Sequence, residues 1–485
     1  MSLKTICIDE VPTDLFIGGA WRESSTGKRI NVFNPATEQR LASVADASIE
    51  DARLAVDAAA KAAPAWAATA PRKRSEILRR CFELMTRDAE QIAQIITLEN
   101  GKALADARGE VAYAAEFFRW FAEEAVRVNG EISIAPSGAA RTIVQYRPVG
   151  IALLITPWNF PAAMATRKLG PALAAGCTCI LKPATETPLT AYAIANLLTE
   201  AGVPEGVVNV LTTSTAGEVS NVILDDPRVR KLSFTGSTAV GRILLRKAAD
   251  SVVNCSMELG GNAPFIVFDD ADIVAAVEGA MIAKMRNGGE ACTAANRIYV
   301  QRSALAEFSE RLASRIGMLV TDDGMHSRTQ CGPLVNKAAV DKVASLVNDA
   351  CAKGARVLTG GKSPDRTGYF YLPTVLADVT ADADLLREEI FGPVAPIVSF
   401  DTEDQAIELA NETEYGLVAY IYTRDLARGL RVAERVESGM IALNRGLVSD
   451  PAAPFGGVKQ SGLGREGAHH GLLEFLEAKY ISTNW

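Results

Sequence analysis

The stretch MRNGGEACTAANR, residues 285 to 297, holds one cysteine that could act as a nucleophile. Gly288 and Gly289 precede Cys292, and glycine lets the backbone approach a bound molecule closely. A free thiol has a pKa of about 8.5, so attack by Cys292 requires surroundings that favour the thiolate. The alternative is an inert buried thiol, which is the better interpretation of Cys292 taken alone.

Two other stretches place a polar side chain beside small or rigid residues. In MELGGNAPF, Glu258 precedes a diglycine at the end of an apolar run, where its carboxylate could act as a base. In ITPWNFP, two prolines bracket Asn159, whose amide could donate a hydrogen bond to an oxyanion. A surface residue at a domain boundary and a turn residue are the structural alternatives for Glu258 and Asn159.

A third pair of stretches could hold a phosphate. SFTGSTAVGRILL places Gly236 and Gly241 between a predicted strand and a predicted helix. Backbone N–H groups and the positive end of the helix dipole at such a turn attract anions, and Ser237 could add a hydroxyl. In LKPATETP, Lys182 stands at a strand end and could hold ribose or phosphate oxygens. A tight turn and a solvated lysine are the alternatives.

The segments that must position these residues alternate between two patterns. From residue 151, the apolar runs IALLIT, TCILKPA, GVVNVLT and KLSFTG alternate with Ala-rich helical runs, and a second series follows Met257. This alternation predicts an α/β fold with parallel strands joined by crossover helices. We expect two α/β units, with a boundary near residues 258–261.

The first part of the chain is predicted to be helical. Ser48 and Asp51 form a capping box ahead of an Ala-rich helix. Apolar residues at helical spacing predict another helix over residues 75–100, with Gly101 as its C-terminal stop. A later segment, RTIVQYRPVG, is predicted to be a strand.

Composition excludes several classes of protein. The 485 residues carry a formal net charge of −8, which argues against non-specific binding of nucleic acid. No apolar run reaches the roughly 18 residues of a membrane span, and the start of the chain lacks the features of a secretory signal. The 8 cysteines are too sparse for a disulfide scaffold, so we expect reduced thiols and a cytoplasmic location. The CTC run at 177–179 lacks a second pair of ligands, and no metal site is predicted.

Seven motifs in order show that the chain resembles the aldehyde dehydrogenase family over nearly its whole length. The motifs are PWNFP, LKPATETP, FTGSTAVG, MELGGNAP, GGEACTAANR, EEIFGPV and PFGGVKQSGLGREG. Each is weak evidence alone, but their common order is not expected by chance. The resemblance implies a Rossmann-type dinucleotide-binding domain, an α/β catalytic domain and a β-hairpin oligomerisation arm.

The resemblance also implies a mechanism. Cys292 would attack the aldehyde carbon to give a thiohemiacetal, whose oxyanion the Asn159 amide and the Cys292 N–H would hold. Loss of hydride to the nicotinamide would leave a thioester, which water activated by Glu258 would hydrolyse. Lys168 and Glu466 match family positions that contact the base or relay its protons.

The family positions that bind the coenzyme can be carried over in the same way. Glu389 and Phe391, in EEIFGPV, match residues that hold the nicotinamide ribose and ring. The complete predicted coenzyme site is Ile155, Thr156, Trp158, Lys182, Thr185, Gly236, Ser237, Gly241, Leu259, Glu389 and Phe391.

Three residues indicate an acidic substrate. Arg167, Arg286 and Ser449 stand where the succinate semialdehyde dehydrogenases have residues that grip the distal carboxylate. A carboxylate that leaves water needs charge-assisted hydrogen bonds, and arginine supplies two in a fork. The alternative is that both arginines pair with structural carboxylates. Glutarate semialdehyde is a close rival substrate, since one methylene discriminates by only about 1–3 kcal/mol.

Thr185 bears on the choice of coenzyme. Members of the family that prefer NAD often have glutamate at this position, where it holds both ribose hydroxyls and repels a 2′-phosphate. Here Thr185 fills the position and Glu186 is displaced by one residue. We therefore favour NADP, with NAD or dual use as the alternative.

The resemblance implies three structural parts. The dinucleotide-binding domain would span residues 1–124 and 147–258, and the catalytic domain residues 259–458. Residues 125–146 and 459–485 would form the oligomerisation arm. A hairpin there has too little core of its own, so we expect it to lie on a partner in a homodimer or homotetramer.

Three rival functions remain open. A non-catalytic protein of the same fold is disfavoured by the joint presence of Cys292, Glu258 and Asn159. A coenzyme A-dependent acylating enzyme is disfavoured by Glu258, since such members commonly lack the base. A broad aliphatic or aromatic aldehyde dehydrogenase would need an apolar funnel in place of Arg167 and Arg286.

Two residues near the cysteine depart from the family pattern. Glu290 stands where glutamine is commoner. Ala294 stands where many of these enzymes have a second cysteine that can form a redox disulfide with the first.

Ala294 therefore leads to a first prediction. Mild oxidation is expected to produce no reversible disulfide between Cys292 and a near neighbour, because the partner thiol is absent. Peptide mapping after treatment with dilute peroxide tests this. Inactivation of the protein with recovery of Cys292 in a disulfide would contradict it.

Overall fold

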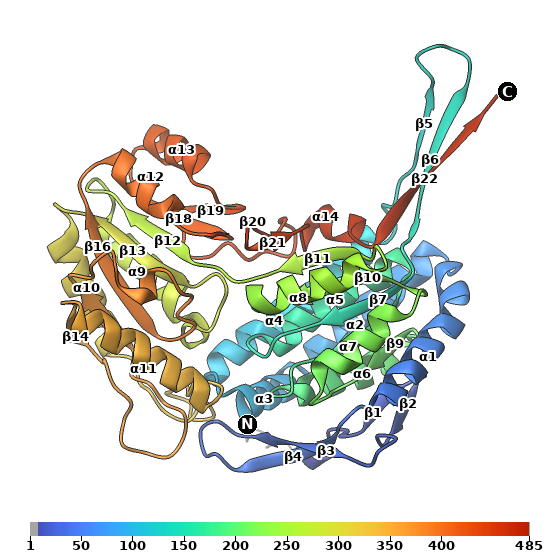
Figure 1. Cartoon of the computed structure of the whole chain (residues 1–485), viewed down its shortest axis with the longest axis horizontal. Coiled ribbons are helices and arrows are strands. Elements are labelled where there is room, and N and C mark those ends of the chain that lie inside the picture. The colour runs from blue at the N-terminus through green and yellow to red at the C-terminus, as the bar shows by residue number, and fades with distance from the viewer. Residues whose placement is uncertain (1–7, 485) are drawn as a thin grey trace.

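Two large sheets covered by helices make up the body of the molecule, and a narrow three-stranded arm projects from it (Figure 1). The computed structural model describes residues 8–484. Residues 1–7, which include part of the start of the chain that is predicted not to be a secretory signal, lie outside the described part.

The first sheet has 8 strands in the order β2-β1-β9-β8-β7-β10-β11-β21. The strands are β1 (Leu15–Ile17), β2 (Ala20–Arg22), β7 (Ile151–Ile155), β8 (Thr178–Lys182), β9 (Val208–Val210), β10 (Val229–Thr235), β11 (Asn254–Glu258) and β21 (Gly462–Leu463). The central strands from β9 to β11 are parallel, as the alternating sequence pattern predicts. All residues of β7 and β8 are buried, because helices cover both faces.

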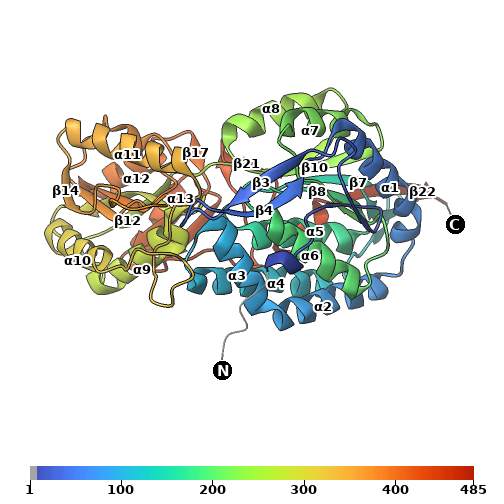
Figure 2. The same ribbon diagram turned by 90° about the horizontal axis from the view of Figure 1, so that it is seen from below.

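Figure 2 shows this sheet between two groups of helices. One face is covered by α1 (Ile49–Ala67), α7 (Ala216–Asp225) and α8 (Thr238–Ala249). The other face is covered by α2 (Pro71–Arg87), α3 (Ala89–Asn100), α4 (Leu104–Glu124), α5 (Pro161–Ala175) and α6 (Pro188–Ala201).

The predicted capping box of α1 is confirmed, with Ser48 and Asp51 bonding each other's backbone N–H groups. The single helix expected over residues 75–100 is wrong, since α2 ends at Arg87 and α3 begins at Ala89. Asp88 separates them with φ −96° and ψ 14°, and the Arg87 guanidinium at this break binds the Glu200 carboxylate of α6 at 2.6 and 2.8 Å. Gly101 ends α3 in the left-handed conformation, as predicted.

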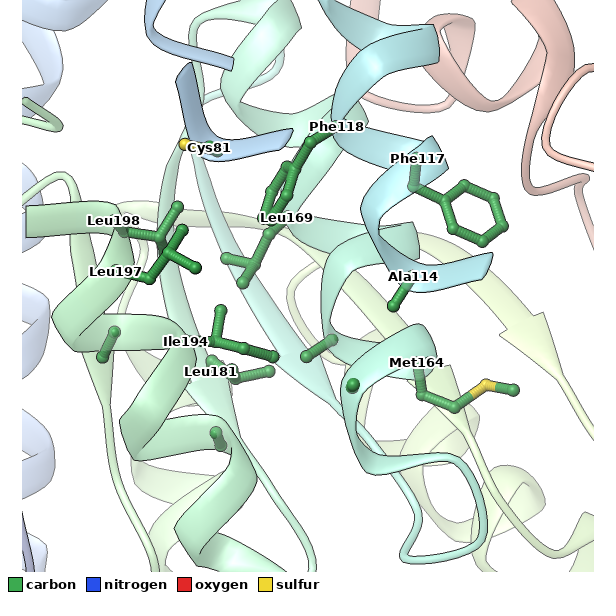
Figure 3. Packing of buried hydrophobic residues seen from close by; sticks show 14 of the residues in the cluster. Cys81, Ala114, Phe117, Phe118, Met164, Leu169, Leu181, Ile194, Leu197 and Leu198 are labelled. Atoms are coloured by element: carbon green, nitrogen blue, oxygen red, sulfur yellow. The ribbon is translucent and has the colours of Figure 1, made fainter. Parts of the chain in front are cut away.

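Helices α4, α5 and α6 pack into a common apolar core (Figure 3). Phe117 and Phe118 of α4, Leu169 of α5 and Ile194 and Leu198 of α6 are all buried in it. Gly170 permits this packing, because a Cβ there would lie 3.0 Å from the Phe121 ring. The start of α4 is therefore held rigidly against the start of α5.

The second sheet has 7 strands in the order β14-β15-β16-β13-β12-β18-β19. The strands are β12 (Ala263–Val267), β13 (Ala295–Gln301), β14 (Arg356–Thr359), β15 (Thr374–Ala377), β16 (Val394–Phe400), β18 (Val418–Tyr422) and β19 (Met440–Leu443). Its helices are α9 (Ile273–Met285), α10 (Leu305–Gly317), α11 (Lys337–Ala352), α12 (Glu403–Asn411) and α13 (Leu426–Arg435).

Shorter elements complete the body. They are β3 (Arg29–Phe33), β4 (Arg40–Ala45), β17 (Tyr415–Gly416), β20 (Val458–Lys459), α14 (Ala468–Leu473) and the short 3-10 helices η1 (Ile8–Glu10), η2 (Arg286–Gly289) and η3 (Asp384–Leu386).

The two sheets meet edge to edge. Strands β7, β8, β10 and β11 end side by side, since Ile155 pairs with Lys182 and Thr235 pairs with Glu258. Only residues 259–262 separate the end of β11 from the start of β12. Strand β13 begins beside β12, three residues after Cys292, so the carboxyl edge of the first sheet faces the amino edge of the second.

The arm consists of β5 (Glu131–Ile134), β6 (Arg141–Pro148) and β22 (Leu476–Thr483). The order β22-β6-β5 joins the predicted hairpin to the C-terminal strand. Ile132 and Ile134 are 72% and 60% exposed on it. Among residues 8–484, no helix combines the length and apolar character needed to cross a bilayer.

Candidate active site

A cavity lies where the edges of the two sheets meet, and it unites residues from distant motifs. Eight of the residues predicted from the sequence line it: Trp158, Asn159, Gly236, Ser237, Leu259, Cys292, Glu389 and Phe391. They come from five loops that follow strands of the first sheet or precede strands of the second. A shared cavity is the geometry that covalent chemistry beside a bound coenzyme requires.

Cys292 lies in a turn closed by a hydrogen bond from the Ala294 N–H to the Ala291 carbonyl, 2.9 Å long. The chain at Gly261 crosses directly over this turn, because a Cβ there would lie 2.2 Å from the Cys292 carbonyl oxygen. The Tyr420 hydroxyl donates to the Thr293 carbonyl at 2.8 Å. No acceptor among residues 8–484 takes the Cys292 N–H, which leaves it available to an oxyanion.

The Asn159 side chain reaches the same turn. Its Nδ2 donates to the Glu290 carbonyl at 3.0 Å, two residues before Cys292. Its Oδ1 is buried without a hydrogen-bond partner in the described part of the chain. A buried amide directed at a cysteine turn can supply an N–H to negative charge that develops beside the sulfur.

Glu258 lies at the end of β11, buried beside a chain of paired charges. Glu466 accepts a hydrogen bond from Lys168 Nζ at 2.6 Å and forms an ion pair with Arg167. Lys168 Nζ also donates to the Ser233 hydroxyl at 2.9 Å. Oε2 of Glu258 has no partner within residues 8–484, so it can accept a proton.

Burial and charge shift the pKa values of these groups in opposite directions. Burial and the negative charge of Glu466 raise the pKa of Glu258 well above its usual value, although Arg167 and Lys168 oppose them. The pKa of Glu466 is lowered, because Arg167 and Lys168 outweigh its burial. Glu258 therefore has the higher proton affinity of the two carboxylates, as a general base needs.

The Cys292 thiol is held protonated in this structure. Burial raises its pKa to about 12, and the positive charge of Arg167 only partly offsets this. The negative charges of Glu389, Glu258 and Glu466 act in the same direction as burial. A proton acceptor must therefore assist attack by the sulfur, and Glu258 is electrostatically coupled to it.

The two predicted substrate arginines lie in different environments. Arg167, on α5, pairs with Glu466 and lies over the Phe455 ring at 4.2 Å, so it satisfies a structural carboxylate. Arg286 lies over the Phe160 ring at 4.9 Å and near the Tyr113 ring at 6.0 Å. Among residues 8–484, no carboxylate forms an ion pair with Arg286.

Ser449, the third predicted carboxylate ligand, lies half-buried in the loop after β19, which also carries Phe455. Within the described residues, no hydrogen bond joins it to either arginine. The sequence analysis did not single out Tyr113 of α4. Its hydroxyl is buried and has no hydrogen-bond partner among the described residues. Burial raises its pKa, and the charges of Arg167 and Arg286 oppose that shift.

The glycine turn between β10 and α8 forms one end of the coenzyme site. Gly241 allows α8 to pack against the strand ends, because a Cβ there would lie 2.4 Å from a methyl of Leu259. The Ser237 hydroxyl caps α8 by accepting the Val240 N–H at 3.4 Å. The backbone N–H groups at this helix start face the cavity edge, which suits an anionic group.

Lys182 and Thr185 follow β8 at the same edge of the sheet. Burial lowers the pKa of Lys182 to about 8, against the opposing charge of Glu186. The Thr185 hydroxyl donates to the Glu186 carboxylate at 3.2 Å. Ile155 is the last residue of β7, and the Thr156 N–H donates to the Lys182 carbonyl at 3.1 Å, which fixes these loops together.

The other end of the coenzyme site is aromatic and acidic. The Trp158 and Phe391 rings meet edge to face, with 5.3 Å between their centroids. Glu389 accepts the Gly261 N–H at 3.1 Å, and burial raises its pKa to about 7. An apolar slot with one carboxylate fits a nicotinamide ring and its ribose.

Several structural partners of the site were missed by the sequence analysis. They include Lys102, Asp106, Glu110 and Asn287, whose contacts converge on the loops of Asn159 and Cys292. The signal in the sequence is the four-residue spacing of Asp106 and Glu110, which puts them on one face of α4, while Lys102 lies in the turn before this helix.

Within residues 8–484, no group of three metal-ligating side chains could hold an ion. Cys81, Cys177, Cys179, Cys255, Cys292, Cys331 and Cys351 are free thiols.

Comparison with known proteins places the chain in a family. The model of the aldehyde dehydrogenase family matches residues 21–481. A succinate-semialdehyde dehydrogenase of Paenarthrobacter nicotinovorans is 56% identical over 441 residues, which cover 91% of this chain and 98% of that protein. A glutarate-semialdehyde dehydrogenase of Pseudomonas putida is 49% identical over 466 residues, 96% of each chain.

A crystal structure of an E. coli NADP-dependent enzyme superimposes with a TM-score of 0.97 at 48% identity and covers 98% of each chain. The chain therefore belongs to the aldehyde dehydrogenase family. The predicted family, fold class and enzyme class are confirmed.

The buried thiol leads to a second prediction. The thiolate is the species that reacts with iodoacetamide, and a pKa of about 12 leaves only a small thiolate fraction near neutral pH. Alkylation of Cys292 in the coenzyme-free protein should therefore accelerate about tenfold per pH unit from pH 7 to 10. Mass spectrometry of the Cys292 peptide measures the rate, with Cys292→Ser as the control. A plateau below pH 8 would show an activated thiolate.

Proposed function

We propose that this chain oxidises succinate semialdehyde to succinate with NAD(P)+. The observation that carries the proposal is the single cavity shared by Cys292, Asn159 and the residues of the nicotinamide end, Glu389 and Phe391. The relatives named for succinate semialdehyde support the substrate. When bound, the nicotinamide ring supplies the hydride acceptor for the reaction.

In this mechanism, Cys292 Sγ bonds to the aldehyde carbon as its proton passes to Glu258. Asn159 Nδ2 and the Cys292 N–H stabilise the negative charge that develops on the former carbonyl oxygen. Oxidation leaves the acyl group on sulfur as a thioester. Glu258 releases the thiol proton to solvent before hydrolysis. It then takes a proton from the attacking water and passes it to the departing sulfur, which releases the acid and the free thiol. The opposite charges of Lys168 and Glu466 lie beside Glu258 and set its proton affinity.

Arg286 is the residue we assign to the distal carboxylate of the substrate. It carries a positive charge that no described carboxylate neutralises, and two aromatic rings hold its side chain. Arg167 is paired with Glu466, and its charge adds positive potential near Cys292. If this ion pair breaks, Arg167 can make a second contact with the substrate carboxylate. Ser449 and Arg167 remain predicted ligands.

Glutarate semialdehyde is the second candidate substrate, favoured by the relative of Pseudomonas putida named for it. The same arginine would hold its carboxylate one methylene further from the sulfur. Such a difference is worth only about 1–3 kcal/mol, so activity with both substrates is compatible with the site.

The coenzyme site fits NADP better than NAD at the adenosine ribose. Lys182 and Thr185 offer donors to a 2′-phosphate, and no carboxylate stands at position 185 itself. Glu186 faces Thr185 and limits the preference, since its charge opposes a second anion. We therefore favour NADP, with NAD accepted at lower efficiency.

We assign the first sheet, within residues 1–124 and 147–258, to the coenzyme, and residues 259–458 to the catalytic domain. The arm, with its exposed Ile132 and Ile134, supports a homodimer or homotetramer. The free cysteines of the described residues support a reducing compartment, for which the cytoplasm is the simplest assignment.

A substrate comparison tests the proposal. Initial rates of NADPH formation with succinate semialdehyde should far exceed those with butanal, an uncharged aldehyde of similar length. Arg286→Ala should lower kcat/KM for succinate semialdehyde by roughly 10- to 150-fold, the effect of about 1.5–3 kcal/mol for a hydrogen bond to a charge. Its effect on butanal should stay within about threefold. Equal losses for both substrates would assign Arg286 a structural role.

A coenzyme swap forms a further prediction. Thr185→Glu should lower kcat/KM for NADP at least about tenfold relative to NAD, because the new carboxylate repels the 2′-phosphate. Glu186→Gln is the matched variant and should shift the ratio toward NADP, since it removes a negative charge from the same site. A hundredfold preference of the unaltered protein for NAD would contradict our assignment.

A further inference from the structure

We propose that Lys102, Asp106 and Glu110, with Asn287, are positioning residues that hold the Asn159 amide in register with the Cys292 turn. We call these four residues the α4 bracket. The inference rests on the function proposed above and extends it to residues that touch neither substrate nor coenzyme.

Lys102 makes the first contact of the bracket. Its Nζ donates to the Asn159 carbonyl at 2.6 Å and to Glu110 Oε2 at 2.6 Å, and it lies 4.3 Å from the centroid of the Phe160 ring. The side chains of Lys102 and Glu110 are 1% and 0% exposed. A fully buried ion pair is costly unless it is well bonded, so its presence beside the Asn159 loop indicates a geometric role.

Glu110 makes the second contact. Its Oε1 accepts the N–H groups of Ala162 and Ala163 at 2.8 and 3.3 Å. These are unpaired donors of the first turn of α5, and Phe160 at the N-cap supplies no side-chain bond to them. Glu110 thus caps α5 from a neighbouring helix and fixes the point at which the Asn159 loop enters α5.

Asp106 and Asn287 carry the bracket to the nucleophile. Asp106 lies one turn before Glu110 on α4, and its carboxylate accepts the Asn287 N–H at 3.1 Å. The Asn287 amide donates to the carbonyls of both Asn159 and Glu290, each at 3.0 Å. Asn287 adopts a φ of 56°, a left-handed conformation that asparagine tolerates better than most other non-glycine residues.

The contacts form a closed ring. One end of α4 binds the loop that carries Asn159, the same end binds the loop that leads to Cys292, and Asn287 joins the two loops directly. Because α4 is packed rigidly on α5 (Figure 3), the separation of amide and sulfur is set by α4. An oxyanion donor that is misplaced by about 1 Å loses most of its effect.

A double-mutant cycle tests the bracket. The paired variant Lys102→Met/Glu110→Gln removes both buried charges together and leaves an oxygen that can still cap α5. It is measured in the unaltered background and in Asn159→Ala. We expect Asn159→Ala to lower kcat by roughly 100- to 1,000-fold. The paired variant should lower kcat at least about tenfold, leave KM for NADP unchanged, and have less than about a twofold effect when Asn159 is already alanine.

The matched control is Lys231→Met/Glu474→Gln. Lys231 is another buried lysine, 3.2 Å from Glu474, and it contacts neither catalytic loop. Its removal tests the general effect of losing an ion pair with a buried lysine and a partly exposed glutamate, and its effect on kcat should be the same in both backgrounds. Asn287→Gly provides a second bracket variant if the paired variant does not fold, since glycine accepts the positive φ and loses only the two amide bonds.

The outcomes separate the two proposals. If Asn159→Ala leaves kcat unchanged, the oxyanion role in the proposed function is wrong and the bracket has no catalytic purpose. If Asn159→Ala is defective but the paired variant and Asn287→Gly lower kcat equally in both backgrounds, or not at all, the bracket is overturned and the proposed function stands.

Discussion

The crossing of the chain at Gly261 over the Cys292 turn is the constraint on which the site depends. A Cβ at position 261 would lie 2.2 Å from the Cys292 carbonyl, so only glycine allows the carboxyl edge of one sheet to meet the amino edge of the other. Gly261 also donates its N–H to Glu389 at 3.1 Å. One glycine thus brings the Cys292 turn and Glu389 together, and both residues line the same cavity.

Once the two edges are in contact, burial controls the chemistry. Glu258 and Glu466 are buried and Cys292 and Glu389 are half-buried, and loss of contact with water favours the neutral forms of acids. Arg167 and Lys168 keep Glu466 ionised, and the negative charge of Glu466 in turn raises the proton affinity of Glu258. The pKa of Glu258 and the pKa of the Cys292 thiol are both raised. The raised proton affinity of Glu258 makes it a better acceptor for the thiol proton.

The two arginines show how tertiary structure distinguishes residues that look equivalent in the sequence. Both stand at positions expected to grip a carboxylate, yet Arg167 pairs with Glu466 and Arg286 pairs with no described acid. Glu466 is 299 residues from Arg167 along the chain, so no local pattern could reveal the pair. Arg167 therefore lies in an ion pair, whereas Arg286 lies against aromatic rings, and this difference is the basis on which we propose Arg286 as the substrate ligand.

The sequence by itself determined the α/β class, the parallel strands, the capping box of α1 and the stop at Gly101, and its ordered motifs singled out Cys292, Glu258 and Asn159 as candidates. These follow from local periodicity, turn chemistry and ordered motifs, which short-range interactions encode. The break at Asp88, the Arg167–Glu466 pair and the α4 bracket were decided only by tertiary structure. Each depends on side chains that meet through folding, and the cost or gain of burying a charge is set by partners that the linear sequence does not place.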